Sequence, residues 1–290
     1  MELDELDLKA AEVFDGYLVR KDLVRTFARQ FPVPTYVVEF MLGRYCSSVD
    51  EDEINEGLEI VQRQLAERTV RAGEEELFKA RAYKKGSEKL IDMVSVRFSE
   101  KDNGYLANLP SLNLNRVRIP DSIVDDNERL LTGGFYAEVT LEYDSIIAEE
   151  KGNAFGISEL RPIQMSSRNV LDVMAEARKE FSSEQWRDFL LRSIGLEAKA
   201  LDQRAKDAVL LRMVPFVERN YNLVELGPRG TGKSHLFQQV SPYAHLISGG
   251  KATVARMFVN NATGQRGLVC QYDVVCFDEV SGISFDTKEG

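Results

Sequence analysis

The sequence of 290 residues is poor in the side chains from which metal centres and disulfide frameworks are built. It has three cysteines, Cys46, Cys270 and Cys276, and two histidines, His235 and His245. Three cysteines without a regular spacing give no disulfide pattern, which indicates a reducing compartment. Because there are only two histidines and no Cys-x-x-Cys pair, the sequence argues against a structural zinc site.

The sequence also lacks long apolar runs and an excess of positive charge. Its apolar runs are too short to span a bilayer, and its acidic N-terminus is unlike a signal peptide, so we expect a cytoplasmic protein without a membrane partner. The net charge of −10 argues against non-specific binding of nucleic acid by the whole surface. An oligomer that lines a channel with a local basic surface stays open, so this charge neither shows nor excludes DNA binding.

One stretch, residues 227–234, fits the phosphate-binding pattern G-x-x-x-x-G-K-[ST] at every fixed position. The apolar segment before it, 221–226, is predicted to be a buried strand, and 235–240 are predicted to be helical. In that context the loop surrounds phosphate oxygens with backbone N–H groups, so the sequence predicts a site for ATP and Mg²⁺. The loop consists of Gly227, Pro228, Arg229, Gly230, Thr231, Gly232, Lys233, which reaches the β- and γ-phosphates, and Ser234, which holds Mg²⁺.

A second acidic element lies downstream, where residues 273–279 read D-V-V-C-F-D-E. This is an apolar strand that ends in two carboxylates, the form of a Walker B motif. Asp278 is predicted to help hold the Mg²⁺ shell, and Glu279 to polarise the attacking water as a general base. The spacing between the two motifs leaves room for a helix, a strand and a second helix. Together the motifs favour an ATP hydrolase, with Lys233 and Glu279 as catalytic residues, over a kinase or a GTPase.

The pattern of apolar residues predicts an α+β multidomain chain with three parts. Residues 1–88 form an N-terminal helical domain. From residue 89 to 166 the period changes to that of strands, and about five short strands predict a small barrel, for which an OB-type Greek key is the leading candidate. Residues 167–290 return to helix and then form the N-terminal part of a P-loop α/β ATPase domain.

Two features of these domains leave nucleic-acid binding open. The first helices carry Arg20, Lys21, Arg25 and Arg29, and form either a helix-turn-helix or, as is more common, a small bundle with a solvated face. OB barrels often bind single strands, yet this barrel is acidic overall and its aromatic residues are also what a barrel core needs. Neither feature by itself predicts DNA binding.

Seven stretches of the chain together resemble one family. They are residues 130–134, 139–143, 161–166, 186–196, 217–234, 246–255 and 273–282. In these stretches the chain is similar to the Lon-related AAA+ proteins of the BREX phage-defence systems, the BrxL family, and the likeness spans most of the chain. Sensor and arginine-finger residues of such ATPases have no counterpart after the Walker B motif. We therefore expect residues 1–290 to be the N-terminal portion of a longer protein.

The resemblance implies a bacterial cytoplasmic ATPase that restricts phage and assembles on double-stranded DNA as a hexamer or a stacked double hexamer, with DNA in the ring channel and other BREX components as partners. It also implies an architecture similar to MCM helicases, followed by a Lon-like C-terminal domain. Two alternatives stay open: an ATP-dependent Lon-type protease that acts on proteins, and, for residues 1–290 alone, a non-catalytic DNA-binding or assembly module with little ATPase activity. The nucleotide roles implied by the family fall on Gly227, Gly230, Gly232, Lys233, Ser234, Asp278 and Glu279.

Overall fold

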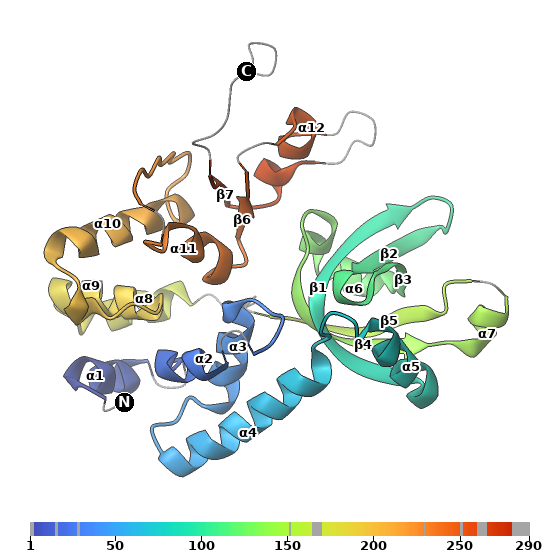
Figure 1. Ribbon diagram of the computed structural model, residues 1–290, viewed down its shortest axis with the longest axis horizontal. Coiled ribbons are helices and arrows are strands. Elements are labelled where there is room, and N and C mark those ends of the chain that lie inside the picture. The colour runs from blue at the N-terminus through green and yellow to red at the C-terminus, as the bar shows by residue number, and fades with distance from the viewer. Residues whose placement is uncertain are drawn as a thin grey trace. The chain divides into compact units, whose positions relative to one another are not determined.

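The computed structural model describes residues 3–14, 17–27, 30–150, 152–163, 170–228, 230–249, 252–259 and 266–279 (Figure 1). The chain separates into two units, residues 1–206 and 207–290, which are described one at a time. None of the described helices is long and apolar enough to cross a membrane.

The first unit begins with helices whose ends depend on local sequence. Asp4 and Asp7 form a capping box at the start of α1, and Asp50 accepts hydrogen bonds from the first amides of α4. The acidic run after Asp50 lies in the first turn of α4, where the helix dipole favours negative charge. The first five helices are α1 (Glu5–Val13), α2 (Lys21–Phe27), α3 (Thr35–Tyr45), α4 (Glu51–Arg68) and α5 (Glu75–Lys85).

The basic residues that would serve a helix-turn-helix are mostly engaged within the unit. Arg20 forms a two-bonded ion pair with Asp22, and Lys21 lies 2.6 Å from Glu39. Arg25 donates to the carbonyl of Gly195, and Arg29 lies outside the described residues. Arg20 and Lys21 are therefore paired with carboxylates, whereas Arg25 contacts only a neutral carbonyl in these bonds and keeps its positive charge.

The strands of the first unit form a closed five-stranded barrel in the order β1-β2-β3-β5-β4, which confirms the predicted small barrel. The long strand β1 pairs with β4 through its first half and with β2 through its second half, and β3 lies parallel to β5. Helices α6 (Asp121–Asp125) and α7 (Ser145–Glu149) lie between strands in the chain. The strands are β1 (Ser87–Ser99), β2 (Gly104–Leu109), β3 (Leu114–Ile119), β4 (Phe135–Tyr143) and β5 (Phe155–Pro162).

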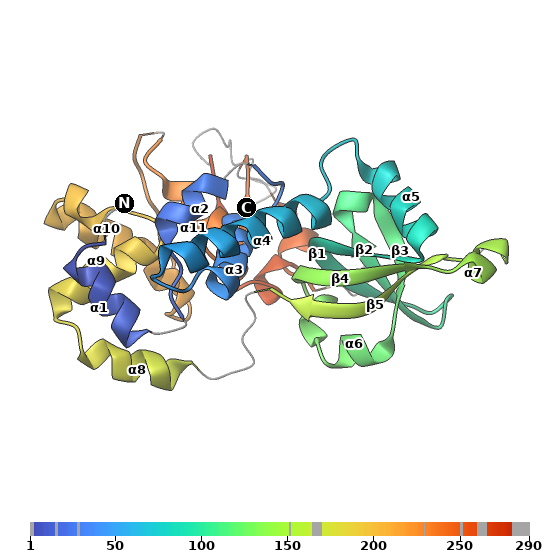
Figure 2. The ribbon, with the colours of Figure 1, turned by 90° about the horizontal axis from the view of Figure 1, so that it is seen from below.

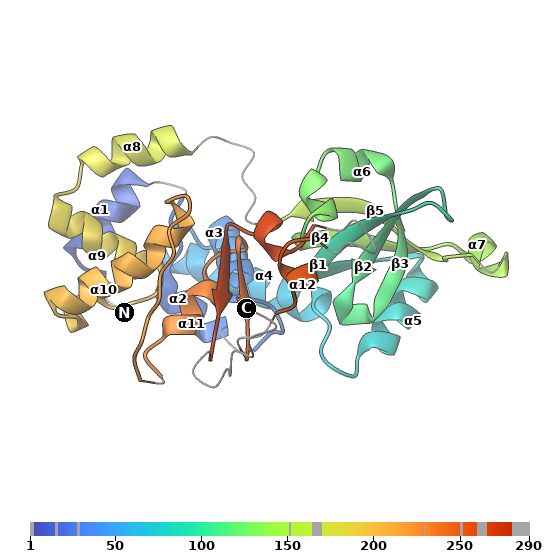
Figure 3. The ribbon, with the colours of Figure 1, turned by 90° about the horizontal axis from the view of Figure 1, so that it is seen from above.

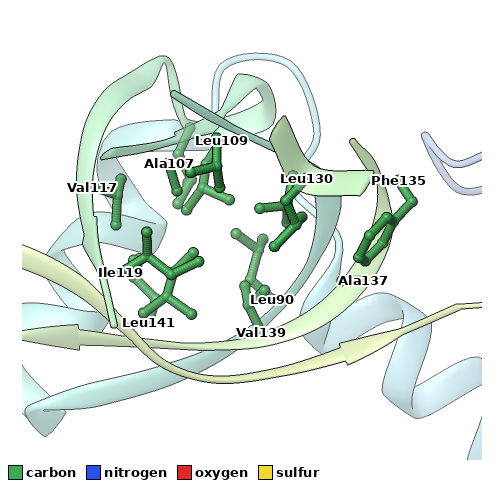
Figure 4. Packing of buried hydrophobic residues seen from close by; sticks show 14 of the residues in the cluster. Leu90, Ala107, Leu109, Val117, Ile119, Leu130, Phe135, Ala137, Val139 and Leu141 are labelled. Carbon is green, nitrogen blue, oxygen red and sulfur yellow. The ribbon is translucent and has the colours of Figure 1, made fainter. Parts of the chain in front are cut away.

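Apolar side chains fill the barrel because alternate residues of each strand point inward. Leu90, Val117 and Leu141 come from three different strands and line the interior, and Leu130 belongs to the same core (Figure 4). Figures 2 and 3 show α5 and α6 on opposite sides of the barrel. Phe78 and Ala82 of α5 join the barrel core, so this helix is part of the same hydrophobic unit.

Helix α1 packs against the segment that contains α8 (Leu171–Lys179) and α9 (Ser183–Ser193). The ring of Phe14 stacks on Phe189 at 5.0 Å, and Trp186 lies against both Phe181 and Phe189. The single tryptophan of the chain thus packs within a cluster of aromatic rings. Arg192 donates two hydrogen bonds to Asp4 and one to Asp7. These bonds hold the pKa of Asp4 well below its usual range.

The described residues of the second unit contain a two-stranded parallel sheet and short helices. Its elements are α10 (Gln203–Met213, whose first residues belong to the first unit), the 3-10 turn η4 (Val214–Phe216), α11 (Lys233–Gln239), β6 (Ala244–Ile247), α12 (Val254–Met257), the 3-10 turn η5 (Leu268–Cys270) and β7 (Val274–Phe277). The helix after the glycine loop and the strand of the Walker B motif are confirmed.

The prediction of a buried strand over 221–226 is wrong for this structure. These residues adopt no regular structure, and Val224 and Leu226 are 82% and 88% exposed. A central strand is stable only when a neighbour satisfies its backbone groups. Within the described residues the sheet of this unit has two strands, β6 and β7, and neither pairs with 221–226.

The buried carboxyl group of Asp92 makes a testable contribution to the pH dependence of stability. Burial raises its pKa to about 6, although Ser111 and the amide of Met93 donate hydrogen bonds to it. The folded state holds this proton more tightly than the unfolded chain, so the stabilisation is complete below about pH 4 and is lost as the pH rises through 6. The expected loss is about 3 kcal/mol.

Urea unfolding of the wild type and of Asp92→Asn between pH 4 and 7 measures this difference. The variant is expected to lack the fall in unfolding free energy, whereas Asp126→Asn, a change at an exposed carboxylate, is expected to keep it. Parallel pH profiles of the wild type and Asp92→Asn would contradict the assignment.

Candidate nucleotide-binding site

The site is built at the ends of the two parallel strands. Strand β6 pairs with β7 in the register Ala244–Val274 to Ile247–Phe277, so both strands end at the same edge (Figure 1). The amide of Asp278, the residue after β7, donates to the carbonyl of Ile247 at 2.9 Å. This bond continues the ladder for one step and fixes Asp278 at the carboxyl edge of the sheet, where parallel sheets commonly bind ligands.

The glycine loop leads into α11 through two residues with left-handed backbone. Gly230 and Gly232 have φ values of 82° and 74°, which a residue with a Cβ adopts only at a cost. Gly232 is the N-cap of α11, and Lys233 and Ser234 are its first two residues. The two glycines therefore let the chain turn sharply from the loop into the helix.

Lys233 folds back over its own loop. Its Nζ donates to the carbonyl of Gly227 at 3.2 Å, to the carbonyl of Pro228, and to Oγ1 of Thr231 at 3.0 Å. Thr231 in turn donates to the carbonyl of Pro228 at 3.2 Å. The ammonium group thus donates to oxygen atoms of its own loop, and these are contacts that it can exchange for anionic oxygens.

The two motifs meet through Ser234 and Asp278, which are far apart in the sequence. Oγ of Ser234 donates to Oδ2 of Asp278 at 2.6 Å. The other carboxylate oxygen, Oδ1, accepts the amide of Glu279 at 2.9 Å. The hydroxyl group of Ser234 and the carboxylate of Asp278 are thereby held side by side at the C-terminal end of the glycine loop.

Glu279 and Arg229 are the remaining predicted site residues, and the structure describes the first of them. Glu279 has a φ of 58°, an uncommon conformation for a residue that is not glycine, and such outliers gather at functional sites. Arg229 lies outside the described residues, so its predicted role has no structural description. Burial, together with the charge of Asp278, raises the pKa of the Cys276 thiol to about 11, so this thiol stays neutral beside the site.

Two contacts hold the flanks of the loop, and the sequence did not single out Arg212 and Glu225, which make the first of them. Glu225 forms a two-bonded ion pair with Arg212, and the ring of Phe237 in α11 stacks on Phe216 at 5.6 Å. One signal was present: Glu225 is an acidic residue inside an apolar segment, and such a residue needs a partner.

The oxygen atoms of Ser234 and Asp278 suit Mg²⁺. Among the described residues no group of three or more His, Cys, Asp or Glu side chains could hold a metal ion. Mg²⁺ does not need such a cage, because it keeps several waters and binds one or two protein oxygens together with substrate phosphates. The 2.6 Å contact brings two such oxygens together, so the donor set fits this ion.

A glycine loop that ends in Lys-Ser at a helix start, linked by its serine to the acid at the end of a parallel strand, defines the P-loop class of nucleotide-binding domains. Two family models match the chain. "BREX system Lon protease-like protein BrxL N-terminal" matches residues 12–143, and "Lon-like protease BrxL-like, ATPase domain" matches residues 155–290. The chain belongs to the BrxL family, as the sequence stretches predicted.

Two relatives described as Lon-like protease BrxL are similar to the chain over nearly its whole length. The relative from Escherichia coli O9:H4 (strain HS) is 45% identical over 286 residues, which are 99% of this chain and 41% of the relative. The relative from Bacillus cereus (strain H3081.97) is 42% identical over 289 residues, which are 99% of this chain and 42% of the relative. The chain therefore spans less than half the length of these curated relatives.

The contact between Ser234 and Asp278 predicts that Mg²⁺ strengthens nucleotide binding through these two residues. In a titration with a fluorescent ATP analogue, we expect Ser234→Ala and Asp278→Asn to lose most of the gain in affinity that Mg²⁺ gives the wild type, roughly tenfold or more. Asp273→Asn, at the opposite end of β7, is the matched control and should keep the gain. An equal Mg²⁺ effect in all four proteins would rule out this pair as the ion's ligands.

Proposed function

We propose that the chain binds ATP with Mg²⁺ at the loop of residues 227–234, and that the complete protein hydrolyses ATP there. The observation that carries the proposal is the 2.6 Å hydrogen bond between Ser234 and Asp278. It joins the glycine loop to the acidic end of β7 in one site. A glycine turn with an incidental lysine would not require a partner carboxylate at that place.

In the proposed binding step, Lys233 leaves the carbonyl groups of Gly227 and Pro228 for the β- and γ-phosphate oxygens. The exchange replaces neutral acceptors by charged ones, and hydrogen bonds between charged groups are shorter and about twice as strong. Loop amides orient the phosphates, while Ser234 and Asp278 hold Mg²⁺, which neutralises charge on the phosphates.

In the proposed hydrolytic step, Glu279 accepts a proton from the attacking water. Its place directly after Asp278 supports this role, because both carboxylates then stand at the edge of the sheet where the phosphates are bound. The backbone of Glu279 is left-handed, a conformation that gathers at functional sites.

We further propose that the complete protein works as a ring of subunits on double-stranded DNA in BREX phage defence, in the manner of MCM-type motors. Family membership supports the link to other BREX components. The strand order β1-β2-β3-β5-β4, with β3 parallel to β5, supports an OB-type Greek key for the barrel, a fold that often carries nucleic-acid sites.

Removal of the Lys233 ammonium tests nucleotide binding. Lys233→Ala is expected to weaken binding of a fluorescent ATP analogue at least about 100-fold, because charge-assisted contacts to the phosphates are lost. Lys79→Ala, which removes a lysine from α5 in the first unit, should bind like the wild type. Unchanged affinity of Lys233→Ala would place the nucleotide elsewhere.

Glu279→Gln tests hydrolysis in the complete protein. The amide keeps the size of the side chain but cannot accept the proton, so we expect nucleotide affinity close to that of the wild type and turnover reduced at least about 100-fold. Phosphate release and analogue binding, measured on the same preparation, separate the two effects. Wild-type turnover by this variant would remove Glu279 from the mechanism.

A second candidate function is ATP-dependent proteolysis, which the names of the two relatives favour. A gel shift with duplex DNA, set beside a casein-degradation assay on the complete protein, distinguishes it from the first. Degradation without DNA binding favours the protease, and DNA binding without degradation favours the motor. Binding of DNA by residues 1–290 without any ATP turnover in the complete protein would instead favour an assembly module.

A further inference from the structure

The glycine loop is held from both sides by one short segment of the second unit. This segment runs from the last turn of α10 through η4 and carries Arg212 and Phe216. Arg212 contacts Glu225, two residues before the loop begins, and Phe216 contacts Phe237, three residues after Ser234. Arg212 and Phe216 are only four residues apart in the chain, so one short segment contacts both flanks of the loop.

The ion pair on the N-terminal flank has the geometry of a strong contact between a guanidinium and a carboxylate. Nε and Nη2 of Arg212 donate to the two carboxylate oxygens of Glu225 at 2.7 and 2.6 Å. Two parallel bonds between a guanidinium and a carboxylate fix orientation as well as distance. The side chain of Arg212 is 14% exposed and that of Glu225 is 31% exposed, so the pair is partly shielded from water.

The N-terminal flank, residues 221–226, depends on this contact because no β-sheet hydrogen bonds hold it among the described residues. Among the described residues no strand pairs with 221–226, and the neighbours of Glu225, Val224 and Leu226, point into solvent. The position of Gly227, and with it the first amides and carbonyls of the loop, then depends on where Glu225 is anchored.

We propose that Arg212 is a positioning residue for nucleotide binding, acting through Glu225 on the N-terminal flank of the phosphate loop. The proposal rests on the proposed function of the loop. Loop donors must stand in place before phosphate arrives, since a displacement of about 1 Å at a binding site can cost two orders of magnitude in rate. Arg212 touches no phosphate in this role; it sets the geometry of the groups that do.

The test measures the affinity of the 290-residue chain for a fluorescent ATP analogue with Mg²⁺. Arg212→Ala and Glu225→Ala are each expected to weaken binding about tenfold, because the flank loses its anchor. The double variant Arg212→Ala/Glu225→Ala should be no weaker than either single variant, since both changes remove the same contact. The charge-swapped double variant Arg212→Glu/Glu225→Arg is expected to regain most of the lost affinity.

Three controls make the outcome decisive. Arg116→Ala removes an arginine that pairs with Asp102 in the barrel and should leave affinity within about twofold of the wild type. Thermal unfolding of each variant separates a local effect from loss of the fold. Lys233→Ala reports whether the loop is the nucleotide site at all.

If the wild type does not bind the analogue, or if Lys233→Ala binds it normally, the proposed function fails. If those two proteins behave as expected, wild-type affinity of Arg212→Ala overturns the positioning role. That role is also overturned if the effects of the single variants add in the double variant, or if the charge-swapped variant is as stable as the wild type and yet binds as weakly as the single variants.

Discussion

The parallel pairing of β6 with β7 is the constraint on which the nucleotide site depends. Parallel strands that end at the same edge bring together the residues directly after each strand, and here the ladder extends one step to the amide of Asp278. Asp278 can then meet Ser234, although the two residues come from motifs separated by a helix, a strand and a second helix. A shift of one residue in this register would turn Asp278 to the other face and leave the serine without its partner.

The positive charge of the loop, on Lys233, makes contacts that it can exchange for phosphate oxygens. Lys233 rests on carbonyl oxygens and a hydroxyl of its own loop, so its charge is partly satisfied while no phosphate is present. Anchors outside the loop complement this arrangement: a two-bonded ion pair on one flank and a ring stack on the other. The glycines supply turns that other residues resist, and the anchors supply the stiffness that glycines lack.

The first unit is organised by different forces. Its barrel is closed through the pairing of β3 with β5 at Arg118 and Gly156, and inward-pointing aliphatic side chains fill the interior. A few polar groups are buried with partners, and burial moves the pKa of one of them, Asp92, toward neutrality. Arg192 and the aromatic rings around Phe14 hold α1 against α9, although these two helices are far apart in the sequence.

The sequence by itself determined the local features. Asp50, Ser182 and Gly195 mark helix ends through capping and left-handed backbone, alternating apolar residues predict the barrel strands, and fixed spacings predict the loop and the acidic strand end. These features arise from short-range physics, in which neighbouring residues decide the outcome. Only the tertiary structure decided that 221–226 is no strand, that Arg212 anchors Glu225, and that Ser234 touches Asp278. Each of these depends on contacts between distant residues, and apolar character or charge alone cannot specify which partner a residue finds.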